Sequence, residues 1–379
     1  MRIAVVTETY PPEVNGVALT VHALVSQMAA GGHDITLVRP RQPGVSALPQ
    51  PRPIEELLVA GAALPKYPGL RFGFPAGRML ARNFGARRPD AVYVATEGPL
   101  GWSAVRAARK LGIPVATGFH TRFDAYAGAY GLGPLTPLVR AWLRRMHNAS
   151  GATVVPTEEL RGWLEQRGFE RVRVVARGVD TALFDPARRD ARLRARWGVG
   201  PGGLAVIYVG RIAPEKNLEL AIDAFHAIRQ RRADARFVWV GNGPLADRLK
   251  REHPDFVFTG LRLGEDLAGH FASADLFLFP SLTETFGNVT LEAMAAGVAT
   301  VAFDYGAAHA HLKDRVHGRT VACEDAAGFI AAAVETAVDE ATRREMGRAA
   351  RRTALALSPE RVTREFVDLL ASLPAGAPA

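Results

Sequence analysis

Short apolar runs that alternate with helical stretches dominate this chain, and the alternating pattern begins twice. In the first half, the extended runs and helical stretches lie at residues 3–7, 18–30, 35–38, 91–95, 100–111 and 115–118. The pattern begins again with an extended run at 204–209, a helix near 218–229, and extended runs at 237–240, 256–259 and 276–279. Strands that alternate with helices in this way are typical of parallel sheets with helical crossovers. The sequence therefore predicts an α/β protein that contains two such sheets.

The length of the chain agrees with two domains. Its 379 residues, of which 48% are apolar, suffice for two cores at about 100–200 residues per domain. Glycine and proline interrupt the apolar pattern at 178–180, at Pro186 and at 198–203, which predicts a linker zone. We therefore expect Rossmann-like domains at 1–179 and 180–379. A last helix near 358–373 has a Ser-Pro-Glu start and one apolar face, which can pack on either domain, including back on the first.

The positive charge of the chain is concentrated in its first half. Residues 1–179 contain 22 Lys and Arg against 12 Asp and Glu, whereas the remaining residues contain 25 against 26. Such an excess favours an anionic partner; an anionic membrane surface and a compositional bias toward arginine are both consistent with it. Nucleic acid is disfavoured, because the basic residues are scattered without the stacking aromatic residues or zinc-ligand spacing of recognition modules.

Cysteine usage and the N-terminal run bear on the compartment. Cys323 is the single cysteine, so no internal disulfide can form and a reducing compartment is the simplest interpretation. The run at 3–7 is followed by Pro11 and Pro12 and is too short for the core of a signal peptide. No stretch approaches about 20 uninterrupted apolar residues. We expect a cytoplasmic protein, with the alternative of peripheral contact to the inner membrane surface through the N-terminal domain.

The most informative segment is 280–297, where a polar turn follows the predicted strand 276–279 and a helix begins near Gly287 or Asn288. Ligands of open α/β sheets bind beyond the carboxyl ends of the strands, so this turn faces the binding crevice. The backbone N–H groups of Phe286, Gly287 and Asn288 would then be unpaired donors at a helix N-terminus. Such an arrangement favours a diphosphate.

Charged side chains surround this helix start. Glu284 precedes the helix and can reach a sugar, and Glu292 lies about one turn inside it and can reach a ribose. Each carboxylate accepts two hydroxyl hydrogen bonds, which suits sugar diols. Arg211 and Lys216 follow the predicted strand 204–209, so we expect them to enter the same crevice as two cations suited to a diphosphate leaving group.

In the first half of the chain, Gly16 and His120 each lie in a segment that directly follows a predicted strand. Gly16 starts a helix, where its missing side chain allows a phosphate or sugar to approach the backbone. The loop is not a GxGxxG fingerprint, so nicotinamide binding loses support. His120 follows the strand at 115–118, and we favour a sugar contact over a structural role. His309 and His311 lack a third ligand nearby, so we expect no metal and no other cofactor.

Five segments together resemble a known family. They are Glu284 and Glu292 with seven residues between them, the octapeptide at 210–217, the Asn15-Gly16 loop, Phe119-His120-Thr121, and Ala176-Arg177-Gly178-Val179-Asp180. In these segments, which span nearly the whole chain, the sequence resembles the family 4 retaining glycosyltransferases of GT-B fold. More narrowly, it is similar to bacterial GDP-mannose-dependent α-mannosyltransferases and to their sulfoquinovosyl- and glucosyl-transferring relatives.

The resemblance implies two facing Rossmann-like domains with a central cleft, an acceptor on the first domain and a nucleotide sugar on the second. It implies that Glu284 binds the donor hexose, Glu292 the ribose, and His120 the sugar near the reaction centre. The diphosphate would be held by Gly16, Arg211, Lys216, Phe286 and Gly287. Asn288, next to them in the donor site, departs from the aliphatic residue of many members, which leaves the donor open.

The expected reaction is transfer of a hexose with retention, from a nucleotide-sugar donor to a lipid or glycan acceptor. Because no Asp-any-Asp pair occurs, side-chain cations would replace a metal. Glu284 is better placed to bind hydroxyls than to attack carbon, so we expect the acceptor to attack on the face that the phosphate leaves, with that phosphate as the base. We expect an α-mannosyl group from GDP-mannose. The alternatives are a glycolipid synthase that uses UDP-glucose or UDP-sulfoquinovose, and an epimerase or sensor on the same fold. A basic amphipathic stretch at 134–148 is either a core-facing helix or a membrane-surface helix, and the latter favours a lipid acceptor.

Overall fold

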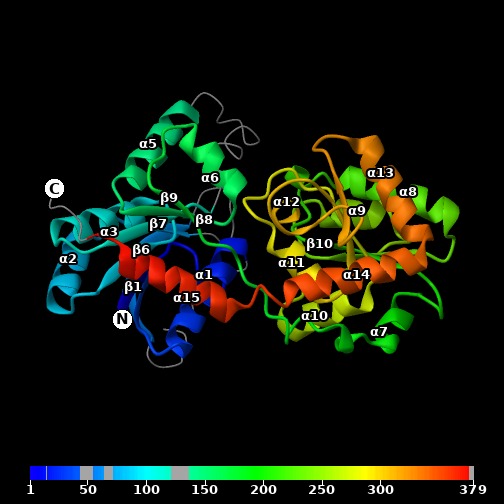
Figure 1. Ribbon diagram of the computed structural model, residues 1–379, viewed down its shortest axis with the longest axis horizontal. Helices are drawn as coiled ribbons and strands as arrows, with labels where there is room; N and C mark the ends of the chain where they lie inside the picture. The colour runs from blue at the N-terminus through cyan, green and yellow to red at the C-terminus, as the bar shows by residue number, and fades with distance from the viewer. Residues whose placement is uncertain (14, 43–53, 64–70, 121–135, 375–379) are drawn as a thin grey trace. The chain divides into compact units, whose positions relative to one another are not determined.

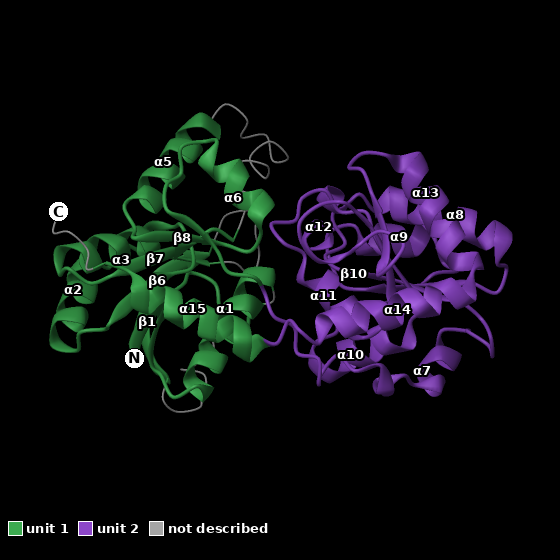
Figure 2. Ribbon diagram, viewed as in Figure 1, with its two compact units in different colours: residues 1–176, 359–379 green, residues 177–358 purple. Residues whose placement is uncertain are grey.

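The computed structural model of the protein describes residues 1–13, 15–42, 54–63, 71–120 and 136–374. The chain forms two compact units (Figure 2). Unit 1 contains Met1–Ala176 together with Pro359–Ala379, and unit 2 contains Arg177–Ser358. Residues 198–203, expected in the linker zone, lie inside unit 2 directly before one of its strands.

Unit 1 is built on a seven-stranded parallel sheet with the strand order β3-β2-β1-β6-β7-β8-β9. Its central strands β6, β7 and β8 are buried at every residue, as expected for a parallel sheet that helices cover on both faces. The strands are β1 (Arg2–Val6), β2 (Asp34–Pro40), β3 (Ile54–Val59), β6 (Ala91–Val94), β7 (Val115–Gly118), β8 (Ala152–Val155) and β9 (Val172–Val174), with a separate ribbon of β4 (Gly61–Ala63) and β5 (Arg71–Gly73).

Helices cover both faces of this sheet, and the alternation of side chains along β1 decides which face each residue meets. Ile3 and Val5 pack with α1 and α15, whereas Ala4 and Val6 pack with α2 and α3. The last helix, α15, thus lies beside α1 although more than 300 residues separate them (Figure 1). The helices of unit 1 are α1 (Gly16–Ala30), α2 (Gly77–Ala86), α3 (Pro99–Lys110), α5 (Thr136–Asn148), α6 (Glu158–Glu165) and α15 (Pro359–Ser372).

Unit 2 is built on a six-stranded parallel sheet with the order β12-β11-β10-β13-β14-β15. Ile207 and Val209 face α10, α11 and α14, whereas Val206 and Tyr208 face α8, α9 and α13. The strands are β10 (Ala205–Val209), β11 (Arg236–Val240), β12 (Val257–Gly260), β13 (Leu276–Phe279), β14 (Ala299–Phe303) and β15 (Gly318–Val321). The helices are α7 (Ala191–Arg196), α8 (Leu218–Arg231), α9 (Ala246–Glu252), α10 (Gly264–Ser273), α11 (Asn288–Ala295), α12 (Ala307–His311), α13 (Ala326–Val338) and α14 (Glu340–Ala354).

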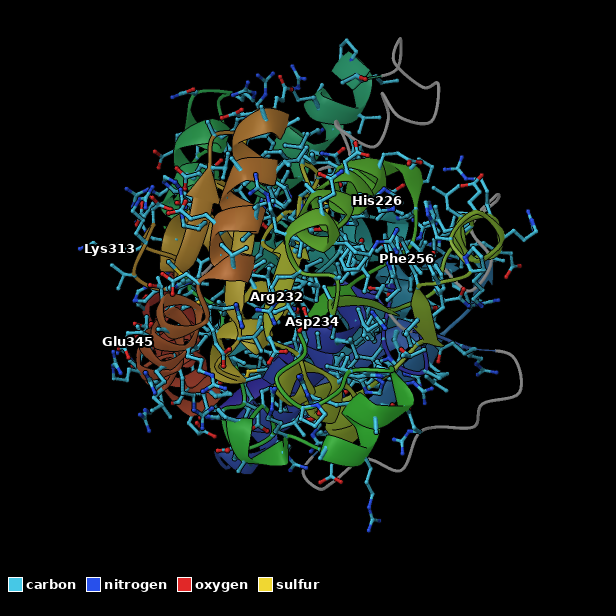
Figure 3. The ribbon with its side chains drawn as sticks, turned by 90° about the vertical axis from the view of Figure 1, so that its right-hand side faces the viewer. His226, Arg232, Asp234, Phe256, Lys313 and Glu345 are labelled. Carbon is cyan, nitrogen blue, oxygen red and sulfur yellow. The ribbon has the colours of Figure 1, made fainter. Side chains whose placement is uncertain are left out.

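Two side-chain contacts of unit 2 lie beside α8. Arg232 and Asp234 form a two-point ion pair, with N–O distances of 2.9 and 2.8 Å, between α8 and β11 (Figure 3). His226 on α8 and Phe256 before β12 lie nearby, with their ring centroids 5.9 Å apart (Figure 3). These contacts join α8 and the residue that follows it to the segments before β11 and β12.

Each sheet reverses its strand order at one place. In unit 1 the reversal lies between β1 and β6, and in unit 2 it lies between β10 and β13. Loops at the carboxyl ends of two such strands diverge and leave room for a ligand, which makes this the usual binding position in open α/β sheets. The loops after β10 and β13 contain Arg211, Lys216 and Glu284.

Candidate active site

The loops after β10 and β13 are joined to each other in unit 2. The hydroxyl of Thr283 donates to the carbonyl oxygen of Glu215 at 3.0 Å, and the side-chain amide of Asn217 donates to the carbonyl oxygen of Pro280 at 3.2 Å. Asn217 itself has a left-handed backbone conformation, φ 54°. These bonds hold the two loops at a fixed spacing, so their charged side chains meet in a defined geometry.

Lys216 and Glu284 form the central ion pair of these loops. The ammonium nitrogen of Lys216 lies 2.5 Å from Oε1 of Glu284, and the hydroxyl of Ser281 donates to the same oxygen at 2.9 Å. Only 11% of the Lys216 side chain and 19% of the Glu284 side chain are exposed. Burial of charge is costly unless the charge is paired. The structure thus brings together the cation and the acid that the sequence placed after two different strands.

Arg211 belongs to the same loop but has its own carboxylate partner. Its guanidinium lies 3.0 Å from Glu215, and its carbonyl oxygen accepts a hydrogen bond from the hydroxyl of Tyr208 at 3.1 Å. Burial raises the pKa of Tyr208 well above its usual value, and the neighbouring charges of Glu284 and Glu215 raise it further. Tyr208 is therefore a neutral hydrogen-bond donor beneath the two acids, a role that sequence reasoning did not assign.

The turn at the start of α11 presents backbone donors. Gly287 has φ 91°, a left-handed conformation in which a larger residue would be strained. The carbonyl oxygen of Phe286 accepts from the N–H of Ala307 at 2.7 Å. In the portion of the chain that the structure describes, the N–H groups of Phe286 and Gly287 donate no hydrogen bond. Such groups at a helix N-terminus suit an anion.

Arg177 meets this same turn from a distant part of the sequence. One guanidinium nitrogen donates to the side-chain oxygen of Asn288 at 3.2 Å, and the guanidinium carbon lies 5.4 Å from the centre of the Phe286 ring. The segment around Arg177 carries part of the family resemblance, but sequence reasoning gave it no role. A separation of 111 residues hides this contact from any local pattern.

Glu292 lies one turn into α11 and is half-buried. Its Oε2 atom is enclosed and has no hydrogen-bond partner among the residues that the structure describes, and burial raises the pKa of Glu292 to about 7. An enclosed acceptor without a partner is uncommon in native proteins and calls for an explanation such as a ligand. A ribose hydroxyl would supply the missing donor.

Gly16 and His120 lie in unit 1. Gly16 is the first residue of α1 and is exposed, and a Cβ atom built on it would meet nothing within 4 Å. His120 follows β7, and its Nε2 lies 2.6 Å from the hydroxyl of Tyr93. A Cβ atom on Gly118 would lie 2.2 Å from that hydroxyl, so glycine is needed there for the pair to form. Thr121 and the rest of 121–135 lie outside the described residues.

Two buried glutamates occupy the reversal of strand order in unit 1, and sequence reasoning missed both. Glu8 follows β1 and accepts a hydrogen bond from the N–H of Leu100 at 3.0 Å, at the start of α3. Burial raises the pKa of Glu8 to about 7, and the neighbouring charge of Glu97 adds to this. Glu97 follows β6 and lies 3.6 Å from Nε2 of His147. Burial raises its pKa as well. No local pattern marks these two residues, because α3 and α5 supply their partners.

Comparisons with known proteins decide the family. The model described as "Glycosyl transferases group 1" matches residues 203–339, and the model described as "Glycosyltransferase Family 4" matches residues 14–183. A GDP-mannose-dependent alpha-mannosyltransferase of Mycolicibacterium smegmatis is 35% identical over 367 residues, which cover 94% of this chain and 93% of the relative. The protein belongs to the family 4 glycosyltransferases.

Two further comparisons indicate the fold of this glycosyltransferase and the class of enzyme to which it belongs. The alpha-monoglucosyldiacylglycerol synthase of Streptococcus pneumoniae is 26% identical over 324 residues, covering 80% of this chain and 71% of the relative. The crystal structure of HepE from Anabaena, in complex with UDP, superposes with a TM-score of 0.80 at 18% identity and covers 98% of this chain and 100% of HepE. The glycosyltransferase therefore has the GT-B fold of two Rossmann-like units, and it is a hexosyltransferase.

Two observations on the glycosyltransferase concern metal binding by its histidines and membrane crossing by its helices. His309 pairs with Asp304 at 2.9 Å, whereas His311 packs edge-on against Phe286 with ring centroids 5.9 Å apart. Among the residues placed by the structure, no three His, Cys, Asp or Glu side chains gather as a metal site would require. Within the same residues, every helix is too short or too polar to cross a bilayer.

Proposed function

We propose that this hexosyltransferase transfers an α-mannosyl group from GDP-mannose to a lipid or glycan acceptor with retention of configuration. The observation that carries the proposal is the pair of Lys216 and Glu284, fixed beside the donor-rich turn at the start of α11. This combination offers a hydroxyl-binding carboxylate, a cation and free backbone N–H groups within two joined loops. A nucleoside diphosphate sugar requires these three kinds of group, since it has hydroxyls next to a pyrophosphate.

In the proposed complex, the N–H groups of Phe286 and Gly287 and the cations of Lys216 and Arg211 hold the diphosphate. Breaking the bond between the anomeric carbon and the phosphate oxygen leaves negative charge on that phosphate, and groups aimed at developing charge supply much of catalysis. These groups would take the place of a metal, so the proposal includes no metal and no other cofactor. Asn288, the first residue of α11, is the remaining proposed donor-site residue of the turn that contains Phe286 and Gly287.

The remaining assignments of the proposal concern the sugar and the nucleoside. Glu284 binds hexose hydroxyls, and Glu292 binds the ribose through its unpartnered Oε2. His120 and Gly16, in unit 1, are proposed contacts of the sugar and of the diphosphate. Glu284 is already paired with Lys216, which suits hydroxyl binding better than attack on carbon. We therefore infer transfer on a single face, with the departing phosphate as the base.

The surface of α5 supports a lipid acceptor at a membrane. Leu138 and Trp142 lie four residues apart on one side of the helix and are 71% and 39% exposed. Trp142 meets Trp102 of α3 edge-on at 5.4 Å. Arg140, Arg144 and Arg145 are exposed on the same helix, in the half of the chain that carries the positive charge. Apolar and aromatic groups beside arginines suit the surface of an anionic bilayer. We therefore propose a cytoplasmic protein that binds the inner membrane surface peripherally.

Vesicle sedimentation tests the membrane part of the proposal. The protein should sediment with anionic vesicles at low salt and be released by high salt, because surface electrostatics are screened. The double variant Arg140→Gln, Arg144→Gln should bind less, whereas Arg192→Gln, Arg196→Gln on α7 serves as a control with the same loss of charge. Equal binding by the two double variants would remove α5 from the proposal.

Donor choice is the point on which the alternatives differ. The S. pneumoniae relative is named as an alpha-monoglucosyldiacylglycerol synthase, so transfer of a glucosyl group remains an alternative. UDP-glucose and UDP-sulfoquinovose are the alternative donors. The experiment incubates the protein with each sugar nucleotide, with and without vesicles that contain diacylglycerol or glycolipid, and determines the product anomer by NMR. We expect acceptor-dependent release of GDP and an α-linked mannosyl product. A β-linked product would refute retention, faster use of a UDP-sugar would favour the alternative, and a new sugar nucleotide formed without acceptor would indicate an epimerase.

A further inference from the structure

The cations that the proposed function assigns to the diphosphate both have carboxylate partners. Lys216 pairs with Glu284 at 2.5 Å and Arg211 pairs with Glu215 at 3.0 Å, so each pair is neutral as a unit. The leaving nucleoside diphosphate gains negative charge as its bond to the sugar breaks. Two neutral pairs oppose this charge less effectively than two isolated cations would, because each carboxylate repels the phosphate that its partner attracts. A further positive charge at the turn is therefore of value.

Arg177 brings a positive charge to the turn that holds the backbone donors. At this turn it contacts the Asn288 amide and the Phe286 ring. They lie on either side of Gly287, whose N–H donates no hydrogen bond in the described structure. A guanidinium is planar, always charged and able to bind two phosphate oxygens at once, so it is the cation best matched to a terminal phosphate.

A purely structural role for Arg177 is the competing explanation. The chain that enters unit 2 is, however, already fixed by other contacts. The N–H of Val179 donates to the carbonyl oxygen of Leu357 at 2.9 Å, and Arg351 donates to the carbonyl oxygens of Thr181 and Phe184 at 2.9 Å each. Val179 is buried in the core of unit 2. The segment therefore does not need the contact of Arg177 with the turn in order to stay in place.

We propose that Arg177 is an additional ligand of the donor's β-phosphate, which becomes the terminal phosphate of the leaving diphosphate, and that Asn288 orients its guanidinium. The proposal rests on the proposed function, because it assumes a nucleoside diphosphate at this turn. It gives a reason for the amide at position 288, where an aliphatic side chain could not accept the hydrogen bond from Arg177. The position that departs from the family pattern and the arginine 111 residues before it would then act as one pair.

Calorimetric titration with GDP and with GMP tests this proposal, because the two ligands differ by the terminal phosphate. Arg177→Met should bind GDP about 10- to 100-fold more weakly than the unmodified protein, as expected for the loss of a charged hydrogen bond, while the affinity for GMP changes little. Arg177→Lys should recover part of the loss, and Asn288→Val should show a smaller loss than Arg177→Met. Arg248→Met serves as the matched control, since Arg248 lies on α9 and pairs with Glu219 on the exposed surface.

The outcomes separate this inference from the function on which it rests. If Arg177→Met binds GDP as tightly as the unmodified protein, or loses GDP and GMP affinity equally, Arg177 is not a ligand of the terminal phosphate, although the proposed function stands. If the unmodified protein binds neither GDP nor UDP, the proposed function fails and the inference fails with it. Thermal unfolding of Arg177→Met, compared with Arg177→Lys and the unmodified protein, checks that any loss of affinity does not come from a loss of folding.

Discussion

Replacing Lys216 by methionine removes one charge from a pair that is largely withdrawn from solvent. The Lys216 ammonium lies 2.5 Å from Glu284, and the two side chains are 11% and 19% exposed. Breaking a fully buried pair costs about 3–5 kcal/mol, whereas an exposed pair contributes about 0–1 kcal/mol. Because Glu284 keeps some exposure and its bond to Ser281, we expect the free energy of unfolding to fall by about 2 kcal/mol.

The same substitution should affect turnover more than stability. If Lys216 opposes the charge that develops on the leaving phosphate, kcat should fall about 10²- to 10³-fold, the usual cost of losing one such donor. Urea unfolding and single-turnover transfer, measured on the same preparation, report the two effects separately. In the double variant Lys216→Met, Glu284→Gln, the loss of stability should be smaller than the sum of the single losses, because neither charge is then left alone.

The control for this prediction is the exposed pair of Arg232 and Asp234 (Figure 3). Arg232→Met removes an ion pair from the same unit in which the Arg232 and Asp234 side chains are 20% and 47% exposed. We expect a loss of less than about 1 kcal/mol and unchanged turnover. The reasoning is refuted if Lys216→Met retains kcat within about threefold, or if it behaves like Arg232→Met in both assays.

Two further predictions concern unit 1. Tyr93→Phe removes the hydrogen bond to His120. We therefore expect kcat to fall about tenfold and the free energy of unfolding to fall by about 1 kcal/mol. An unchanged kcat would show that Tyr93 does not support the active site. Glu8 has a folded-state pKa of about 7 against a usual value of 4.5, so its protonated form stabilises the fold below pH 4.5, and this contribution is lost as pH rises through 7. Relative to Glu8→Gln, the unmodified protein should therefore lose up to about 3 kcal/mol between pH 4.5 and 8 in urea unfolding, and parallel pH profiles would contradict this.

Strand positions that the sequence predicts well are short, fully buried and bounded by glycine or proline. The strands Val115–Gly118 and Leu276–Phe279 agree with prediction at both ends, and Pro280 directly follows the second. In the apolar window at 293–303, the sequence pattern does not predict where one element ends and the next begins. The window contains the end of α11, a turn at Gly297 with φ 72°, and β14. Apolar periodicity alone does not separate a buried helix end from a buried strand.

The parts of the candidate site differ in how far the sequence can reveal them. The contact between Lys216 and Glu284 follows from their positions after the two strands at which the sheet order reverses. The contacts of Arg177 with Asn288 and of Tyr93 with His120 join separate segments, and only tertiary packing brings them together. The sequence predicts that Arg211 is a cation beside Lys216. It does not reveal that the carboxylate of Glu215 neutralises Arg211 within the same loop. Residues 42–53 are rich in proline, which predicts a loop, but all of them after Gln42 lie outside the described residues.

The return of α15 to unit 1 has a consequence for the order in which the molecule is completed. Unit 2 is one uninterrupted segment, Arg177–Ser358, whereas unit 1 requires Pro359–Ser372 to cover its sheet. Phe366 packs against Tyr93 at 4.8 Å, so the support of His120 includes residues near the end of the chain. During synthesis on the ribosome, the half that is translated first is therefore finished last. Unit 2 can form its core before α15 has been synthesised and can cover the sheet of unit 1.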